Sequence, residues 1–196
     1  MDLEGRSAIV AGGAGGLGSA TVRRLVASGA GAVVLDPDSE RAEVLVADLG
    51  DRVAVVGGDS NDDDAVGRAI DLARTLGTFS VAVSATGVVI RSQPLVSRDG
   101  TVLPKATLEA NLGLHVLGPF NLARLSAAAF ADNEPNETGE RGVIVQTASI
   151  SAFDGQVTMV PYAAAKGAIA QTRTPRGARS RAIGSVMATI APLAAA

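Results

Sequence analysis

The sequence contains no cysteine and no tryptophan, and aromatic residues make up only 3% of it. Without cysteine, disulfides, zinc thiolate sites and a thiol nucleophile are excluded. The sequence also lacks a basic leader followed by an apolar run, and any stretch long enough for a membrane span, so we expect a cytoplasmic protein. Its net charge of −3 argues against nucleic acid or an anionic membrane as a partner.

Tyrosine, histidine and lysine are also scarce. There is one tyrosine and one histidine, and Lys105 and Lys166 are the only lysines among 17 basic residues. Tyr162 precedes Lys166 by four residues, so on a helix both lie on the same face. An ammonium favours the phenolate form of a neighbouring tyrosine, and such a pair could move a proton to or from a substrate oxygen. Taken alone, the spacing could also be chance on an alanine-rich helix.

Hydrophobic residues are abundant, at 47% of the chain. Short apolar runs typical of buried strands alternate along the chain with segments of helical periodicity. Apolar runs predict strands at residues 7–13, 32–36, 53–59, 81–87, 142–149 and 185–192. Helical patterns cover residues 16–29, 39–49, 61–77 and 107–131, and begin again at Tyr162. Strands that alternate with helices predict a parallel sheet with helices on both faces, which is a Rossmann-type doubly wound α/β fold. We expect a single domain over residues 1–196, with a polar connection at 88–106.

A glycine-rich turn follows the first predicted strand and opens the first helix. In "GGAGGLG" (12–18), the glycines at 12, 16 and 18 allow a backbone to approach a pyrophosphate at a helix N-terminus. Asp36 ends the second strand, where a carboxylate can accept both ribose hydroxyls of adenosine and repels a 2′-phosphate. The pattern therefore predicts a dinucleotide site that favours NAD over NADP.

Two further polar residues follow predicted strands. Asp59 ends the third strand and could contact adenine or could instead cap the next helix. Ser149 ends the fifth strand, where its hydroxyl could hold the substrate oxygen near Tyr162. Ligands of doubly wound sheets bind at these carboxyl ends.

These motifs resemble the short-chain dehydrogenase/reductase family over residues 1 to about 170, in "GGAGGLG", Asp36, "GGDS", "VAVSATG", "GVIVQTAS" and "YAAAK". The resemblance implies NAD-dependent interconversion of a secondary alcohol and a ketone in a homotetramer, without a metal. Tyr162 is then the acid/base, Lys166 favours its phenolate, and Ser149 orients the substrate. Residues 120–125 and 133–157 are most similar to family members that act on 3-hydroxyacyl-CoA, so a 3-hydroxyacyl-CoA or steroid-like substrate is implied. The cofactor contacts implied are Gly12, Gly16, Leu17, Gly18, Asp36, Asp59, Ser60, Gly87, Tyr162 and Lys166.

The chain departs from the family pattern at an asparagine that relays protons to the lysine. Counting back from Ser149 places His115 at this position, whereas the motif "ANLGL" favours Asn111. The two are four residues apart, so one helical face could present either, and the alternatives stay open. "SATG" (84–87) stands where the family has an asparagine-containing turn, which predicts weaker side-chain bracing of the cofactor site.

The C-terminal part also departs from the family. Pro175 and Gly177 should interrupt the helix that follows Lys166. The sequence ends several dozen residues before the family pattern does, without its last strand and substrate-covering loop. We expect an incomplete record of a longer protein rather than a truncated one. A non-catalytic nucleotide-binding protein or an inactive truncated family member is the alternative function.

Overall fold

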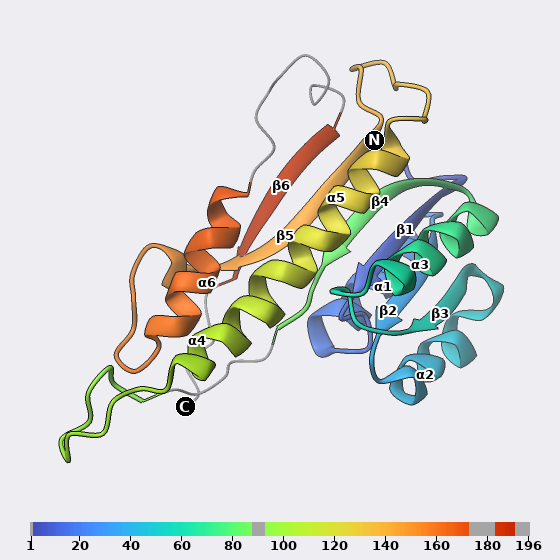
Figure 1. The fold of residues 1–196 in the computed structure, drawn as a ribbon. Coiled ribbons are helices and arrows are strands. Elements are labelled where there is room, and N and C mark those ends of the chain that lie inside the picture. The colour runs from blue at the N-terminus through green and yellow to red at the C-terminus, as the bar shows by residue number, and fades with distance from the viewer. Residues whose placement is uncertain (1, 88–92, 173–182, 191–196) are drawn as a thin grey trace.

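The computed structural model describes residues 2–87, 93–172 and 183–190 (Figure 1). Six strands form one sheet: β1 (Arg6–Ala11), β2 (Gly31–Asp36), β3 (Val53–Gly57), β4 (Thr78–Ser84), β5 (Gly142–Ser149) and β6 (Ile183–Ile190). The helices are α1 (Gly16–Ala27), α2 (Ser39–Leu49), α3 (Asp63–Leu76), α4 (Lys105–Leu112), α5 (Gly118–Phe130) and α6 (Val160–Gln171). The short 3₁₀ turns η1 (Gly50–Arg52) and η3 (Ile150–Ala152) and the π-helical turn η2 (Gly113–Leu117) complete the described elements.

The sheet is parallel throughout, and its strand order is β3-β2-β1-β4-β5-β6. The predicted doubly wound fold is therefore confirmed. The order reverses between β1 and β4, so the carboxyl ends of these two strands define the crevice where such sheets bind ligands.

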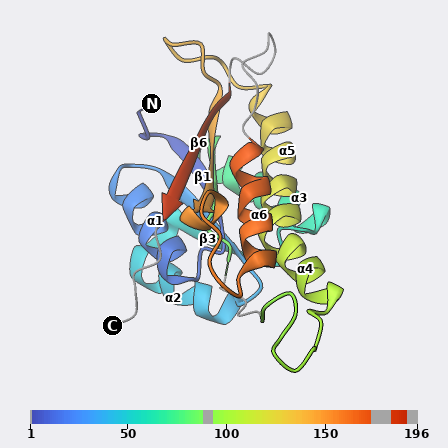
Figure 2. The same ribbon diagram turned by 90° about the vertical axis from the view of Figure 1, so that its left-hand side faces the viewer.

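Alternate residues of each strand pack into two separate cores. Ile9 and Ala11 face the core that α3 and α5 cover, whereas Ala8 and Val10 face the core that α1 and α2 cover. Figure 2 shows α3, α5 and α6 together on one side of the sheet and α1 and α2 on the other. Burial on both faces explains why the strands are almost continuously apolar.

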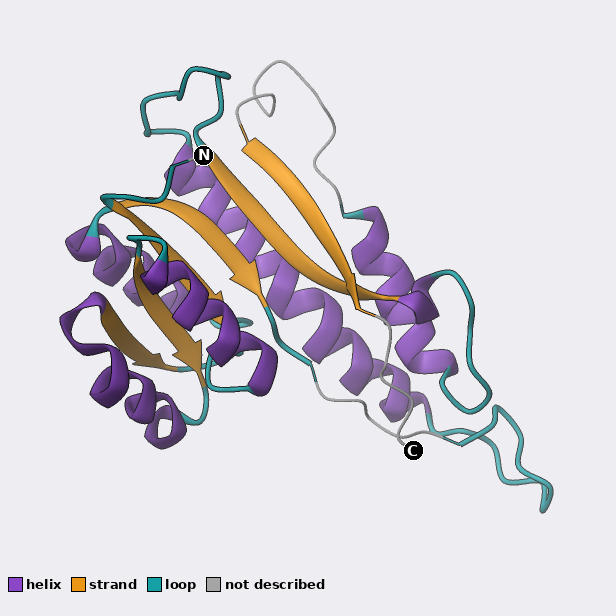
Figure 3. Ribbon diagram, turned by 180° about the vertical axis from the view of Figure 1, so that it is seen from behind, coloured by secondary structure: helices purple, strands orange, loops and turns teal. Residues whose placement is uncertain are grey.

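The element boundaries lie within about three residues of the predicted ones. β4 begins at Thr78, three residues earlier than expected, and the predicted helix over 107–131 is divided by the π-helical turn η2. Within the predicted polar connection 88–106, residues 95–103 form a small hairpin through the antiparallel bridge Val96–Val102. The hairpin projects from the body of the molecule (Figure 3), and both valines are exposed.

The predicted interruption at Pro175 and Gly177 lies outside the described residues, as do the last two residues of the strand predicted at 185–192. α6 ends at Gln171, and Thr172 caps it by bonding its hydroxyl to the Ile169 carbonyl at 2.8 Å. None of the helices in the described part of the chain combines the length and the hydropathy needed to cross a membrane.

Candidate active site

The glycine-rich turn links the carboxyl end of β1 to the start of α1. Gly12 has φ +73°, and a Cβ atom at Gly18 would collide with the Gly12 carbonyl. Both positions therefore require glycine, because the helix begins directly against the turn. By contrast, a Cβ at Gly16 would meet nothing within 4 Å, and Gly15 at the N-cap provides no side-chain hydrogen bond. The first amides of α1 are thus left for a ligand, and they suit a pyrophosphate.

Asp36 is held against this turn. One carboxylate oxygen accepts the Ala14 N–H at 3.0 Å and the other accepts the Asp38 N–H at 3.0 Å. Each oxygen keeps a second lone pair that can accept a ribose hydroxyl. The end of β2 and the glycine turn are therefore joined by the Asp36 carboxylate.

The turn after β3 lies on the same edge of the sheet. Asp59 is exposed, and its Oδ1 accepts the Asn61 N–H at 2.9 Å. The alternative role of Asp59 as a helix cap is wrong, because Asp62 caps α3 by accepting the Asp64 N–H. Asp59 instead shapes the turn that precedes the cap, and Ser60 beside it is buried.

Lys166 is almost completely buried, with 3% of its surface exposed. Its Nζ donates to the Thr147 carbonyl at 2.8 Å and lies 5.8 Å from the centre of the Tyr162 ring. Burial lowers the pKa of Lys166 to about 8. Thr147 lies two residues before Ser149 in β5, so this bond ties the helix that carries Tyr162 to the strand that ends in Ser149.

His115 lies against Tyr162. The two ring centres are 5.1 Å apart and the ring planes meet at 87°. A Cβ added to Gly87, which has φ +144°, would come within 2.9 Å of the imidazole and 3.8 Å of the Lys166 Nζ. Gly87 therefore allows the turn after β4 to approach both side chains.

Asn111, the alternative to His115, is fully buried one turn earlier, in α4. Its amide donates to the Thr107 carbonyl of its own helix at 2.8 Å. The structure thus shows His115 in contact with the tyrosine, whereas the described hydrogen bond of Asn111 stays within its own helix.

Ser149 ends β5 and is also buried. Its Oγ accepts the Ser151 N–H at 3.2 Å and so starts η3. The hydroxyl hydrogen is not used in this bond and can be donated to a substrate oxygen.

Side-chain hydrogen bonds stabilise the turn after β4. The hydroxyls of Ser84 and Thr86 lie 3.1 Å apart, and Thr147 donates its hydroxyl to the Ser84 carbonyl at 2.8 Å. The predicted weakening of the cofactor site at "SATG" is therefore offset by two side-chain hydrogen bonds. Alternation in β5 could have drawn attention to Thr147, a polar residue within an apolar strand.

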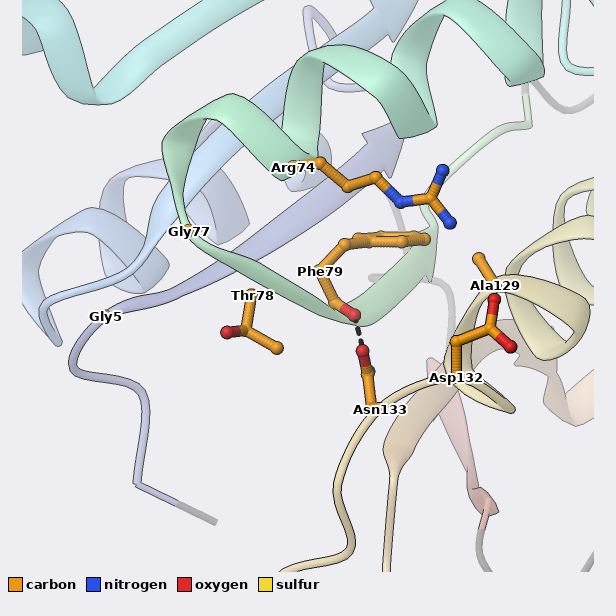
Figure 4. A pocket seen from close by; sticks show the side chains of 8 residues that line it. All are labelled: Gly5, Arg74, Gly77, Thr78, Phe79, Ala129, Asp132 and Asn133. Carbon is orange, nitrogen blue, oxygen red and sulfur yellow. Dashed lines mark hydrogen bonds between the residues drawn. The ribbon is translucent and has the colours of Figure 1, made fainter.

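A hollow of about 470 Å³ lies at the opposite end of the sheet (Figure 4). It is lined by Gly5, before β1, and Phe79, at the start of β4. Asn133 closes one side and donates its amide to the Phe79 carbonyl at 2.8 Å. This hollow is thus formed by the amino ends of the strands and is separate from the group around Tyr162. Among the described residues, no cluster of histidine and acidic side chains could hold a metal.

Comparison with known proteins assigns the chain to a protein family. The family model described as short chain dehydrogenase matches residues 6–175. The chain belongs to this family. It is therefore an oxidoreductase of the class that interconverts alcohols and ketones with a nicotinamide cofactor.

This short-chain dehydrogenase is similar to several characterised proteins. It is 36% identical over 191 residues to the 3-hydroxyacyl-CoA dehydrogenase type-2 of Homo sapiens, covering 97% of this chain and 73% of that protein. The structure of 3-hydroxyacyl-CoA dehydrogenase type-2 from Mycobacterium avium superposes with a TM-score of 0.90 at 41% identity, covering 97% and 75% of the two chains. An NAD⁺-bound xylitol dehydrogenase superposes with a TM-score of 0.73 at 25% identity, covering 86% and 62%.

Proposed function

We propose that this short-chain dehydrogenase oxidises the secondary alcohol of a 3-hydroxyacyl-CoA with NAD, using Tyr162 as the general base. The observation that carries the proposal is the cluster in which Tyr162 lies within reach of both the buried Lys166 and the His115 ring. The names of the two 3-hydroxyacyl-CoA dehydrogenases above support the substrate class. A steroid-like secondary alcohol is the second candidate, since a 3beta-hydroxysteroid dehydrogenase of Eggerthella lenta is 30% identical over 171 residues.

Several features of the site suit NAD. The glycine turn leaves helix amides and open space beside Gly16, and both oxygens of Asp36 are oriented by backbone amides. A 2′-phosphate at Asp36 would meet a fixed negative charge, which favours NAD over NADP. When bound, the nicotinamide ring supplies the hydride acceptor for the alcohol carbon.

The protein's own residues then handle the proton and the oxygen. Ser149 donates its hydroxyl to the substrate oxygen and orients it. Tyr162 removes the alcohol proton, and the Lys166 ammonium stabilises the phenolate because buried charges interact strongly. Lys166 itself is held by the Thr147 carbonyl. We assign to His115 the relay of protons between this group and solvent, in place of the family's asparagine.

Steady-state kinetics with 3-hydroxybutyryl-CoA, a panel of secondary alcohols and NAD test the proposal. Tyr162→Phe removes one oxygen and keeps the ring, so folding and NAD affinity should persist while turnover falls by at least about 100-fold. A Tyr162→Phe enzyme within a few-fold of wild type on its best substrate would refute the mechanism. Binding of NAD without turnover of any alcohol would favour the non-catalytic alternative instead.

A homotetramer is proposed as well, on the basis of exposed apolar side chains. Leu117 of η2 and Phe120 of α5 lie three positions apart and are 57% and 52% exposed, and apolar side chains exposed together can mark a protein interface. Light scattering after size exclusion should give a mass near four chains, and Phe120→Glu should lower it. A wild-type mass of one chain would refute the assembly. A cytoplasmic location stays a prediction.

A further inference from the structure

The turn after β3 is joined to α5 by a buried hydrogen bond. The Asn121 amide donates to the Ser60 carbonyl at 2.9 Å, and the two residues are only 7% and 6% exposed. Sixty-one positions separate them along the chain. A buried carbonyl needs such a partner, because an unpaired one costs the full desolvation of the group.

Two more contacts connect this turn to the ends of η2. The Asn61 amide donates to the Gly113 carbonyl at 3.3 Å, at the first residue of η2. Gly118, just after η2, packs so closely on Ser60 that a Cβ there would collide with the serine hydroxyl. The turn after β3 therefore holds η2 at both ends, and His115 lies between them.

An ion pair strengthens the same junction. Arg124 of α5 contacts both carboxylate oxygens of Asp63 at 2.6 Å, at the start of α3. The hydrogen bond from Arg124, followed by one from Asn121, lowers the pKa of Asp63. Asn121 thus lies at the buried centre of the junction, bonded to the Ser60 carbonyl.

We propose that Asn121 is a positioning residue that couples the adenine end of the cofactor site to the turn carrying His115. The inference rests on the proposed function and on the placement of Asp59 and Ser60 beside the adenosine half of NAD, which the family resemblance implies. A ligand that orders this turn also orders η2, because the turn is bonded to Asn121 through the Ser60 carbonyl and to Gly113 through the Asn61 amide. Occupation of the adenosine subsite then holds the His115 imidazole against Tyr162.

Hydrogen exchange with AMP as the probe tests the coupling without any turnover. Saturating AMP should slow exchange of the backbone amides of residues 113–118 in the wild type by at least about fivefold. In Asn121→Leu, which keeps the side-chain volume and removes the donor, the slowing should fall below about twofold. The AMP dissociation constant should change by less than threefold, because Asn121 does not line the subsite.

Two further variants keep the test decisive. Asn61→Ala removes the bond to Gly113 together with a bond from the same amide to Asp59 Oδ1 at 3.3 Å, and it should weaken the protection even if Asn121→Leu folds poorly. Asn136→Leu, in the distant surface loop over residues 133–141, should leave the protection intact. Equal protection in the wild type, Asn121→Leu and Asn61→Ala would overturn the inference, as would no effect of AMP on residues 113–118.

The outcome is separable from that of the proposed function. Tyr162→Phe should lose turnover and keep the AMP protection. If no alcohol is oxidised but AMP protects η2 through Asn121, the reaction assignment fails and the coupling stands. If turnover follows the proposed mechanism but AMP leaves η2 unchanged, the coupling alone fails.

Discussion

The imidazole of His115 stands edge-on to the phenol ring of Tyr162, with ring centres 5.1 Å apart and planes at 87°. The contact joins the π-helical turn between α4 and α5 to the first turn of α6. It brings the single histidine and the single tyrosine of the chain together. The almost fully buried Lys166 has its Nζ 5.8 Å from the centre of the tyrosine ring.

Replacing His115 should slow the reaction without releasing the cofactor. His115→Leu removes the proton-carrying ring nitrogens, so we expect turnover to fall by at least about tenfold with little change in NAD affinity. Asn111→Leu should have a much smaller effect on turnover, because the described hydrogen bond of Asn111 stays within its own helix. Steady-state kinetics and titration calorimetry measure both quantities. The reverse order of effects would assign the relay to Asn111.

Lys166 should lower the stability of the folded protein at neutral pH. Its pKa is about 8 in the fold against 10.5 when unperturbed, so between these values the unfolded state binds more protons and stability rises with pH. Lys166→Met should therefore stabilise the apoprotein at pH 7 by about 1–2 kcal/mol and abolish most turnover. The gain should shrink as pH rises from about 8 toward 10.5.

Lys105→Met is the matched control for this measurement. Lys105 is the other lysine of the chain, and its side chain is 85% exposed beside Glu109. Denaturant unfolding at pH 7 and 9.5 should show almost no change for this variant. A Lys166→Met protein that is less stable than wild type at pH 7 would contradict the assigned cost of burial.

Asp36 should decide the choice between the two nicotinamide cofactors. Its fixed carboxylate predicts tighter binding of NAD than of NADP, and Asp36→Ala should narrow the difference by removing the negative charge. Dissociation constants for both cofactors, measured at one ionic strength, give the answer. Equal affinities of the wild type for NAD and NADP would show that Asp36 does not discriminate between the two cofactors.

Gly87→Ala should disturb the site through His115. The new methyl group would lie 2.9 Å from the imidazole, and the alanine would have to keep the backbone φ of +144°. We therefore expect a loss of about 1–3 kcal/mol in stability and slower turnover. Gly100→Ala is the control for a positive φ alone, since Gly100 has φ +85° and open space around its Cα. His115→Ala should restore part of the stability of Gly87→Ala. No restoration would place the clash elsewhere.

The order of strands and helices, the glycine turn and the residues at the strand ends could be predicted from the sequence alone. Each depends on local information. Burial on both sheet faces produces the apolar runs, a helix against a tight turn requires Gly12 and Gly18, and a spacing of four residues puts Tyr162 and Lys166 on one helical face.

Only the tertiary structure showed that His115 contacts Tyr162. His115 and Asn111 are both buried, so a spacing of four residues on one helix could not tell which of them contacts the tyrosine. The hydrogen bond from Asn121 to Ser60 could not be predicted from the sequence either, because packing of α5 beside the turn after β3 brings the two residues together. Contacts between distant segments depend on how whole elements pack, and no local periodicity records them.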